Sequence, residues 1–87
     1  MSSFSVRVLT AKRKIFDGPA ESLIVPAFEG KMGILSHHAP LAAVLVPGDI
    51  VIKNQAQPLV FHLSGKGFLR VAHNTIEILL EDQAVSF

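Results

Sequence analysis

Histidine is the residue type best suited to bind a metal ion in this chain of 87 residues, which contains four histidines and no cysteine. His37 and His38 are adjacent, and neighbouring residues of an extended segment point to opposite sides, so two such imidazoles rarely reach one metal ion. His62 and His73 fall in two other expected elements. The spacing favours histidines that are hydrogen-bonded or face a partner. A small module that binds a metal or another ligand through these side chains stays the alternative hypothesis.

Two further chemistries can be tested against motif spacing. Ser64-Gly65-Lys66-Gly67 faintly resembles a phosphate-binding loop, but such a loop needs four residues between its glycines, a following serine or threonine, and a helix. Serine, histidine and aspartate all occur without a nucleophile-elbow motif, and the seven acidic residues are scattered. We therefore expect no catalytic residue, no cofactor and no metal site, in a protein that is not an enzyme.

The composition limits the partners that this chain can have. Its formal net charge is +1, whereas nucleic-acid binding needs a concentrated basic surface, so Lys12-Arg13-Lys14 is interpreted as a solvated corner. The N-terminus lacks a secretory signal, and no apolar run approaches the roughly 20 residues of a membrane span. We expect no nucleic-acid partner and no direct membrane span. Because 49% of the residues are hydrophobic, the sequence predicts either a core with a further apolar face that a partner covers, or a core that takes up all the apolar runs, Leu41–Leu45 and Leu79–Leu80 included.

Alternation of apolar and polar residues with period two predicts strands at the start of the chain. Phe4–Val8 alternates in this way. The turn-forming residues Asp17-Gly18-Pro19 predict that the chain reverses there. A second strand is expected over Glu21–Val25, and Pro26 is expected to end it because proline cannot donate to a central ladder.

Glycine and proline punctuate the middle of the chain. A loop is expected over Ala27–Lys31, followed by a short strand over Met32–Leu35 in which Gly33 marks a bulge or a close backbone approach. Leu41–Leu45 is too short for a helix and is expected to be a strand, which pairs in a hairpin with Ile50–Ile52.

The second half of the chain continues as short strands with turn signals between them. The polar segment Asn54–Pro58 interrupts the pattern, and His73-Asn74 predicts a tight turn. Strands are expected over residues 59–63, 68–71 and 75–80, with a bend or bulge at 64–67. No window carries a helical apolar stripe. The sequence therefore predicts an all-β fold, a flattened antiparallel β-sandwich or barrel of about eight to ten short strands.

Several motifs recur in an order that is typical of one family. They are Val8-Leu9-Thr10-Ala11, Phe16-x-Gly18, Glu29-Gly30-x-x-Gly33-Ile34-Leu35-x-x-His38-Ala39-Pro40-Leu41, Pro47-Gly48, and Leu63-Ser64-Gly65 with Phe68-Leu69-x-Val71. Together they span essentially the whole chain. In this pattern the chain resembles the N-terminal domain of the epsilon subunit of F-type ATP synthase.

The resemblance implies a fold and a role. Residues 1–87 are expected to form a single epsilon-type N-terminal β-sandwich domain. The implied role is that of a non-catalytic subunit of the rotor, or central stalk, which binds the gamma subunit and the c-ring and couples proton translocation to ATP synthesis. The implied location is peripheral, on the cytoplasmic face of the bacterial inner membrane or the equivalent organellar face.

The resemblance also implies which residues meet the partners. Positions that match the c-ring side are Glu29, Gly30, Lys31 and Met32, and positions that match the gamma side are Thr10, His38 and Ala43. Lys31 stands where the family often has an acidic or neutral residue. Ser36-His37 replaces the usual Pro-Gly, which predicts a turn made without a left-handed glycine.

The family usually continues into a C-terminal helical hairpin that can inhibit ATP hydrolysis and in some bacteria binds ATP. This sequence ends at Phe87, before that hairpin. On the polypeptide as given, we therefore expect no inhibitory arm and no nucleotide site.

Overall fold

The computed structural model describes residues 3–54 and 57–86, and ten β-strands lie within these ranges. The strands are β1 (Phe4–Thr10), β2 (Lys14–Ala20), β3 (Ser22–Ala27), β4 (Gly30–Leu35), β5 (Leu41–Leu45), β6 (Gly48–Lys53), β7 (Leu59–Leu63), β8 (Gly67–Ala72), β9 (Thr75–Leu80) and β10 (Val85–Ser86). One 3₁₀ turn, η1 (Asp82–Ala84), precedes β10. None of the helical segments in the described part is long and apolar enough to cross a membrane. The predicted all-β class and strand number are confirmed.

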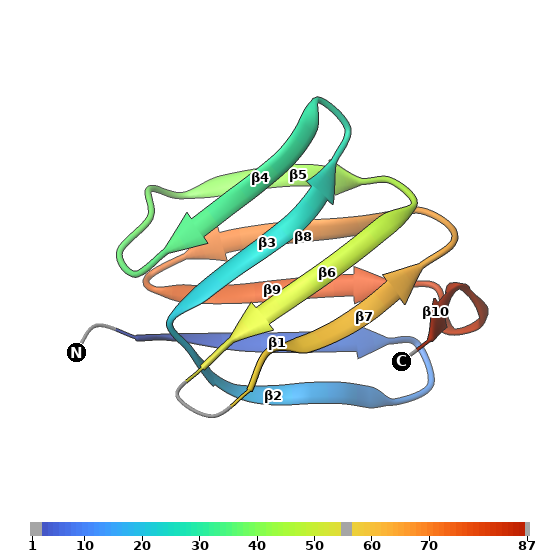
Figure 1. The fold of residues 1–87 in the computed structure, drawn as a ribbon, viewed down its shortest axis with the longest axis horizontal. Helices are drawn as coiled ribbons and strands as arrows, with labels where there is room; N and C mark the ends of the chain where they lie inside the picture. Colours follow the sequence, from blue (N-terminus) through green and yellow to red (C-terminus); the bar gives the residue numbers. More distant parts are fainter. Residues whose placement is uncertain (1–2, 55–56, 87) are drawn as a thin grey trace.

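The strands form two layers that face each other (Figure 1). The front layer has the order β4-β3-β6-β7-β10, and the back layer has the order β5-β8-β9-β1-β2. The layers meet at one corner, where β3 and β5 are matched at Ala27 and Leu45. Neighbouring strands are antiparallel except β1 and β9, which run parallel. The result is a sheet that curls over itself into a flattened sandwich.

The alternation of residue types explains why these segments form strands around one core. In β1 the apolar Phe4, Val6 and Val8 are buried, whereas Ser5 and Arg7 between them are exposed. Burial also alternates along most of the other strands, although some of their exposed positions are apolar, and no polar side chain of the described residues is buried. Both layers contribute to the core, the front layer through Leu23, Val25, Ile34, Ile50 and Ile52 and the back layer through Leu45, Leu69, Val71, Ile76 and Ile78.

The predicted reversal at Asp17-Gly18-Pro19 is wrong. These residues lie inside β2, where they pair with Arg7, Val6 and Ser5 of β1. Because β2 is the outermost strand of the back layer, Pro19 can sit there without a lost ladder bond in a central strand. The chain instead reverses at residues 11–13, where the Thr10 N–H donates to the Arg13 carbonyl at 2.9 Å.

The predicted end of the second strand at Pro26 and the long loop after it are also wrong. Strand β3 passes through Pro26, whose carbonyl accepts the N–H of Val46 at 2.8 Å, and only Phe28 and Glu29 form the turn before β4. Gly33 marks neither a bulge nor a close approach. The β3–β4 register is continuous through it, and no described atom beyond its chain neighbours lies within 4 Å of where its Cβ would be.

The segment Leu41–Leu45 is a strand, as predicted, but its expected hairpin with Ile50–Ile52 is wrong. Strand β5 pairs with β8, whereas β6 pairs with β3 and β7. Pro47 and Gly48, at the junction of β5 and β6, carry the chain from the back layer to the front layer. Gly48 has φ +156° and lies close against Pro26, which lets the two layers approach where the chain crosses.

Other predictions for the second half of the chain are confirmed. His73 and Asn74 form the tight turn with φ values of +53° and +57°, and residues 64–65 form a bend before β8. The last segment adds β10 to β7, with Val85 matched to Leu63. Within the polar segment 54–58, residues 55 and 56 lie outside the described residues.

Candidate interaction surfaces

The residues expected on the c-ring side lie together on the β3–β4 hairpin. Glu29 belongs to the two-residue turn, and β4 begins at Gly30, whose φ of +129° suits glycine. Glu29, Gly30 and Lys31 are exposed, whereas Met32 is half-buried against the core. The hairpin therefore presents one acidic and one basic residue at a narrow tip.

Sequence reasoning missed Phe28 at this tip. Its side chain is 77% exposed, more than any other large hydrophobic side chain described. Its N–H donates to the Val44 carbonyl at 3.0 Å, and the bond from Val46 to Pro26 lies beside it, so the hairpin is braced against β5. The sequence feature that could have indicated an exposed aromatic side chain here is the position of Phe28 directly before the turn residues Glu29-Gly30.

A groove of about 620 Å³ opens between this hairpin and β5. Its lining is mainly apolar, with Glu29 and Lys66 as its charged members. The lining residues are Ala27, Phe28, Glu29, Met32, Leu41, Ala42, Ala43, Val44, Val46 and Lys66. The groove thus brings together Glu29 and Met32 of the c-ring set with Ala43 of the gamma set.

His38 lies in the exposed segment before β5. One of its ring nitrogens, Nδ1, is 2.8 Å from the carbonyl oxygen of Ala39. The preceding residue, His37, has φ +63°, and its N–H donates to Oδ1 of Asn74 at 2.6 Å. The turn is therefore made without glycine, as predicted, but it keeps a left-handed residue, because the bond to Asn74 holds His37 in that conformation.

Thr10 lies away from His38 and Ala43, at the end of β1. Register pairs connect Thr10 through Leu80 and Gly67 to Leu45, the last residue of β5. Strands β8 and β9 lie between β1 and β5, which separates these two strands by about 14 Å. A surface that includes Thr10 and Ala43 must therefore extend across the back layer.

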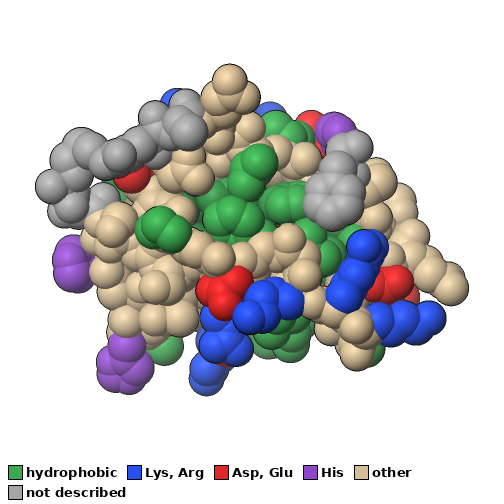
Figure 2. All heavy atoms as spheres, turned by 90° about the horizontal axis from the view of Figure 1, so that it is seen from below, with side chains coloured by type: hydrophobic (Ala, Val, Ile, Leu, Met, Phe, Trp, Pro, Cys, Tyr) green, Lys and Arg blue, Asp and Glu red, His purple; other side chains and the backbone are tan. Residues whose placement is uncertain are grey.

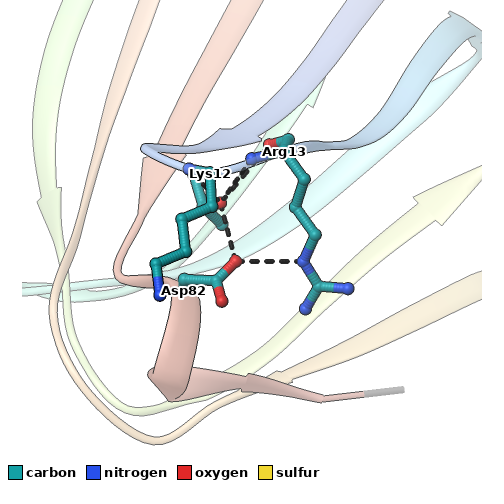
Figure 3. Close-up of polar contacts among 4 residues, drawn as sticks. Lys12, Arg13 and Asp82 are labelled. Carbon is teal, nitrogen blue, oxygen red and sulfur yellow. Dashed lines mark hydrogen bonds and ion pairs between the residues drawn. The ribbon is translucent and has the colours of Figure 1, made fainter.

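The Thr10 hydroxyl is hydrogen-bonded within the chain, to Asp82 and to the backbone of Lys12 and Arg13, the three residues labelled in Figure 3. It donates to Oδ1 of Asp82 at 2.8 Å and accepts the N–H groups of Lys12 and Arg13 at 3.1 Å each. The Arg13 Nε donates to the same Asp82 oxygen at 3.0 Å. This cluster of Thr10, Arg13 and Asp82 ties the β1–β2 turn to the 3₁₀ turn η1.

The cluster predicts how stability depends on pH. Hydrogen bonds from Thr10 and then from Arg13 lower the pKa of Asp82 below its ordinary value of 3.8. The unfolded chain lacks these donors, so the stabilisation is fully present above about pH 5 and is lost as the pH falls through the folded pKa. We expect Asp82→Asn to reduce the fall in melting temperature between about pH 6 and pH 3, measured by circular dichroism. An unchanged fall in the variant would contradict this role, with Glu21→Gln, at a carboxylate outside the ion pairs described, as the control.

An apolar row crosses the outer face of the back layer. Val44, Phe68, Leu79 and Leu9 are successive register partners on β5, β8, β9 and β1. The first three side chains are 45%, 45% and 51% exposed. Leu45 and Leu80, next to two of them in the sequence, are buried. Each apolar run of the sequence is therefore divided between the core and an exposed face.

A charged row runs beside this apolar row. Glu77 on β9 accepts from Arg70 on β8 at 3.0 Å and lies 3.2 Å from Arg7 on β1. Two guanidinium groups thus share one carboxylate, which leaves one positive charge in excess. Such exposed ion pairs contribute little to folding stability, about 0–1 kcal/mol each. Their arrangement mainly affects the binding of a charged partner to this face.

The side of the sandwich bounded by β2 and β7 is also partly apolar. Figure 2 shows hydrophobic side chains gathered in the middle of the face viewed from the β2 side, with charged side chains nearby. Strand β2 contributes the half-buried Ile15 and Phe16, and Leu59 on β7 is 39% exposed. The two layers therefore leave apolar surface at this side as well as at the groove.

The four histidines do not form a metal site in the described part of the chain. Among residues 3–54 and 57–86, no three histidine, aspartate or glutamate side chains are grouped to hold a metal ion. His62 instead pairs with Asp49 on the neighbouring strand, with Nδ1 2.7 Å from Oδ1. Both side chains are more than half exposed.

A protein-family model matches residues 3–86, nearly the whole chain. The family is described as ATP synthase, delta/epsilon chain, beta-sandwich domain. The chain belongs to this family. The resemblance inferred from its sequence motifs is thereby confirmed, and the hairpin, groove and back-layer face described above are surfaces of a delta/epsilon-chain β-sandwich.

Curated relatives of this delta/epsilon-family chain bear consistent names. The ATP synthase epsilon chain 1 of Methylococcus capsulatus is 40% identical over 77 residues, which cover 87% of this chain and 54% of the relative. The ATP synthase epsilon chain of Chromohalobacter salexigens is 37% identical, with 93% and 57% covered. The sodium-ion-specific epsilon chain of Propionigenium modestum is 34% identical, with 94% and 59% covered. The chain spans slightly more than half the length of these relatives.

Solved structures share the fold. A chain in the Euglena gracilis mitochondrial ATP synthase structure, which includes OSCP, F1 and the c-ring, matches 99% of this chain and 54% of its own length, with a TM-score of 0.87 at 18% identity. A chain in the central stalk and c-ring structure of Tetrahymena thermophila matches 90% and 63%, with a TM-score of 0.73 at 23% identity. These structures therefore share the β-sandwich fold of this family member.

Proposed function

We propose that this chain is a non-catalytic rotor subunit in the central stalk of an F-type ATP synthase. In this role residues 1–87 act as a single epsilon-type N-terminal domain that binds the gamma subunit and the c-ring and couples proton translocation to ATP synthesis. The match of the delta/epsilon family model to residues 3–86 carries the proposal. The protein is then peripheral to the membrane, on the cytoplasmic face of the bacterial inner membrane or its organellar equivalent.

For the c-ring we propose the tip of the β3–β4 hairpin, through Glu29, Gly30, Lys31 and Met32. The tip is narrow, exposed and charged with both signs, which suits contact with polar loops of a ring. Its backbone is braced against β5 by the bond from Phe28 to Val44. A braced hairpin loses little conformational entropy on binding, so it can transmit torque without first becoming ordered.

For the gamma subunit we propose a surface that extends over the back layer and includes Thr10, His38 and Ala43. The apolar row of Val44, Phe68, Leu79 and Leu9 crosses the outer face of this layer from β5 to β1. Ala43 and Thr10 lie on the same two strands but on their other face, so the proposed surface must also include the ends of β5 and β1. Apolar surface of this kind is typical of a protein interface when charged residues border it. The shared Glu77 pair beside the row leaves a positive charge for an acidic group of gamma.

Co-purification with both partners tests the proposal. We expect the double variant Glu29→Ala, Lys31→Ala to retain the c-ring at least tenfold less well than the wild type, while its binding to gamma is unchanged. The matched control is Lys14→Ala, Asp17→Ala, which also removes one exposed acid and one exposed base, here from β2. The control is expected to retain both partners.

Two results would count against the proposal. If the hairpin variant retains the c-ring as well as the wild type does, the hairpin is not the contact. If the wild type binds neither gamma nor the c-ring from the same source, the rotor role is wrong, and membership of the family describes the fold alone.

A further inference from the structure

We propose that Asn74 is a positioning residue, whose side chain holds the segment 36–40, and with it His38, in the conformation that the gamma subunit binds. This inference rests on the proposed function, because it takes His38 as part of the gamma surface. It goes further in naming a residue outside that surface which acts on it through a hydrogen bond. Asn74 belongs to the β8–β9 turn, and none of the surfaces described above includes it.

Three segments that are distant in the sequence meet at Asn74. The connection from β4 to β5, the β8–β9 turn and the start of β1 lie at the same end of the sandwich, on the left in Figure 1. The Asn74 Oδ1 accepts the His37 N–H at 2.6 Å, and its Nδ2 donates to the Ser3 carbonyl at 2.9 Å. The Asn74 carbonyl accepts the N–H of Ser5 at 3.2 Å. One residue therefore ties the β4–β5 connection to the start of β1.

The chemistry of this position favours asparagine. Asn74 has φ +57°, a left-handed conformation that asparagine and glycine tolerate better than most residues. Its amide offers an acceptor and a donor, and here the acceptor meets an N–H while the donor meets a carbonyl. Glycine would keep the backbone conformation and lose both bonds, and aspartate would lose the donor. The residue thus serves the turn with its backbone and the neighbouring segments with its side chain.

His37 depends on this bond because its own backbone is also left-handed. Its φ is +63°, and a residue with a side chain keeps such a conformation where its surroundings fix it. Residues 37–40 are exposed, so packing contributes little here. The hydrogen bonds that join this segment to other elements run to Asn74 and Ser3. The short bond from the His37 N–H to Asn74 therefore holds His37 in the left-handed region.

The conformation of His37 sets the direction in which the chain continues to His38. The segment 36–40 carries the chain from β4 in the front layer to β5 in the back layer. The Nδ1 atom of His38 lies 2.8 Å from the Ala39 carbonyl oxygen, a local contact that moves with the segment. Without the bond to Asn74, the free chain populates other directions of this segment. Gamma then binds the fraction that keeps the correct one, which weakens the apparent affinity.

Isothermal titration calorimetry with the gamma subunit tests this role. Asn74→Gly keeps the left-handed turn and removes Oδ1, and we expect it to bind gamma at least tenfold more weakly. Glycine adopts positive φ without support, so adding His37→Gly is expected to restore binding at least threefold. A purely structural loss would not recover, because both side-chain bonds of Asn74 stay absent. The control His73→Gly alters the same turn, at φ +53°, and is expected to bind within about threefold of the wild type.

Amide hydrogen exchange of the free chain, followed by NMR, tests the bond without gamma. We expect the His37 amide of the wild type to exchange at least tenfold more slowly than in the unfolded chain, and Asn74→Gly to lose this protection. Rapid exchange at His37 in the folded wild type would overturn the inference, even if Asn74→Gly did not fold.

The outcomes of the binding experiment separate the inference from the proposed function. If folded Asn74→Gly binds gamma as the wild type does, Asn74 does not position the contact. If the double variant binds no better than Asn74→Gly, Asn74 does not act through His37, and the inference is wrong. If the wild type shows a protected His37 amide and does not bind gamma, the proposed function fails, and the role of Asn74 in gamma binding fails with it.

Discussion

Leu45→Ala is expected to lower the free energy of unfolding by about 3–4 kcal/mol. Leu45 is fully buried and lies at the corner where β3 meets β5, so its side chain packs where the two layers join. Truncation removes apolar contacts and leaves a cavity that this corner cannot readily close, because backbone bonds from Phe28 and Val46 hold it on both sides. The loss is a large fraction of the roughly 5–15 kcal/mol that stabilises a typical domain.

Urea denaturation followed by circular dichroism measures this effect. The matched control is Val44→Ala on the same strand, where the side chain is 45% exposed and the loss is expected to stay below about 1 kcal/mol. The two variants differ in which face of β5 they alter. Equal destabilisation by both would show that the corner is not tightly packed.

Gly48→Ala is expected to cost about 3 kcal/mol, through two causes that act together. The residue has φ +156°, which L side chains rarely adopt, and an added Cβ would lie 2.7 Å from the Cβ of Pro26. Pro26 belongs to β3 and cannot move away without disturbing its bond to Val46. The alanine must therefore shift the crossing between the layers.

Thermal and urea unfolding of Gly48→Ala should be compared with those of Gly33→Ala. Gly33 is also a strand glycine, but nothing lies within 4 Å of its Cβ position and its φ is not positive. Its replacement is expected to change stability by less than about 0.5 kcal/mol. A neutral effect of Gly48→Ala would mean that the crossing relaxes freely, contrary to the packing described above.

The faces of the strands could be predicted from the sequence because a period of two encodes them directly. Phe4–Val8 shows this most clearly, since its alternate residues are buried as expected. The partners of the strands could not be predicted in the same way. Because consecutive strands usually pair, the sequence predicts that Leu41–Leu45 pairs with the next apolar run, Ile50–Ile52, yet it pairs with β8. Pairing depends on contacts between distant segments, which no local pattern records.

Residue types that favour turns predicted one chain reversal correctly and another wrongly, because the same residue types are also tolerated in an edge strand. His73-Asn74 was identified correctly because both residues tolerate the left-handed backbone of a tight hairpin. Asp17-Gly18-Pro19 predicts a turn equally strongly, yet these residues lie inside β2. The same residue types are tolerated in an edge strand such as β2, and the position of a strand within its sheet is a property of the whole fold.

The candidate surfaces were only partly visible in the sequence. The hairpin that carries Glu29–Met32 could be located from its glycines, although its turn is shorter than expected. The exposure of Phe28 could not be predicted from the sequence, because this exposure follows from the hydrogen bond between the Phe28 N–H and Val44, which belongs to the other layer. The hydrogen bond from Thr10 to Asp82 likewise joins residues 72 apart in the sequence. Contacts across that separation emerge only from the folded chain.

The parallel pairing of β1 with β9 affects how the protein can be made. The first strand lies between β2 and β9, and Ser5 is matched with Thr75, so the back layer stays incomplete until β9 has been synthesised. At about 5–20 residues per second, the β1–β2 hairpin, which ends at Ala20, waits roughly 3–12 s until β9 is completed at Leu80. During this time β1 lacks β9, its neighbour in the back layer, although the facing strands β3, β4, β6 and β7 are synthesised earlier. The edge of β1 that β9 later pairs stays open until then, so a slow step late in translation is expected to prolong the exposure of the nascent chain to aggregation.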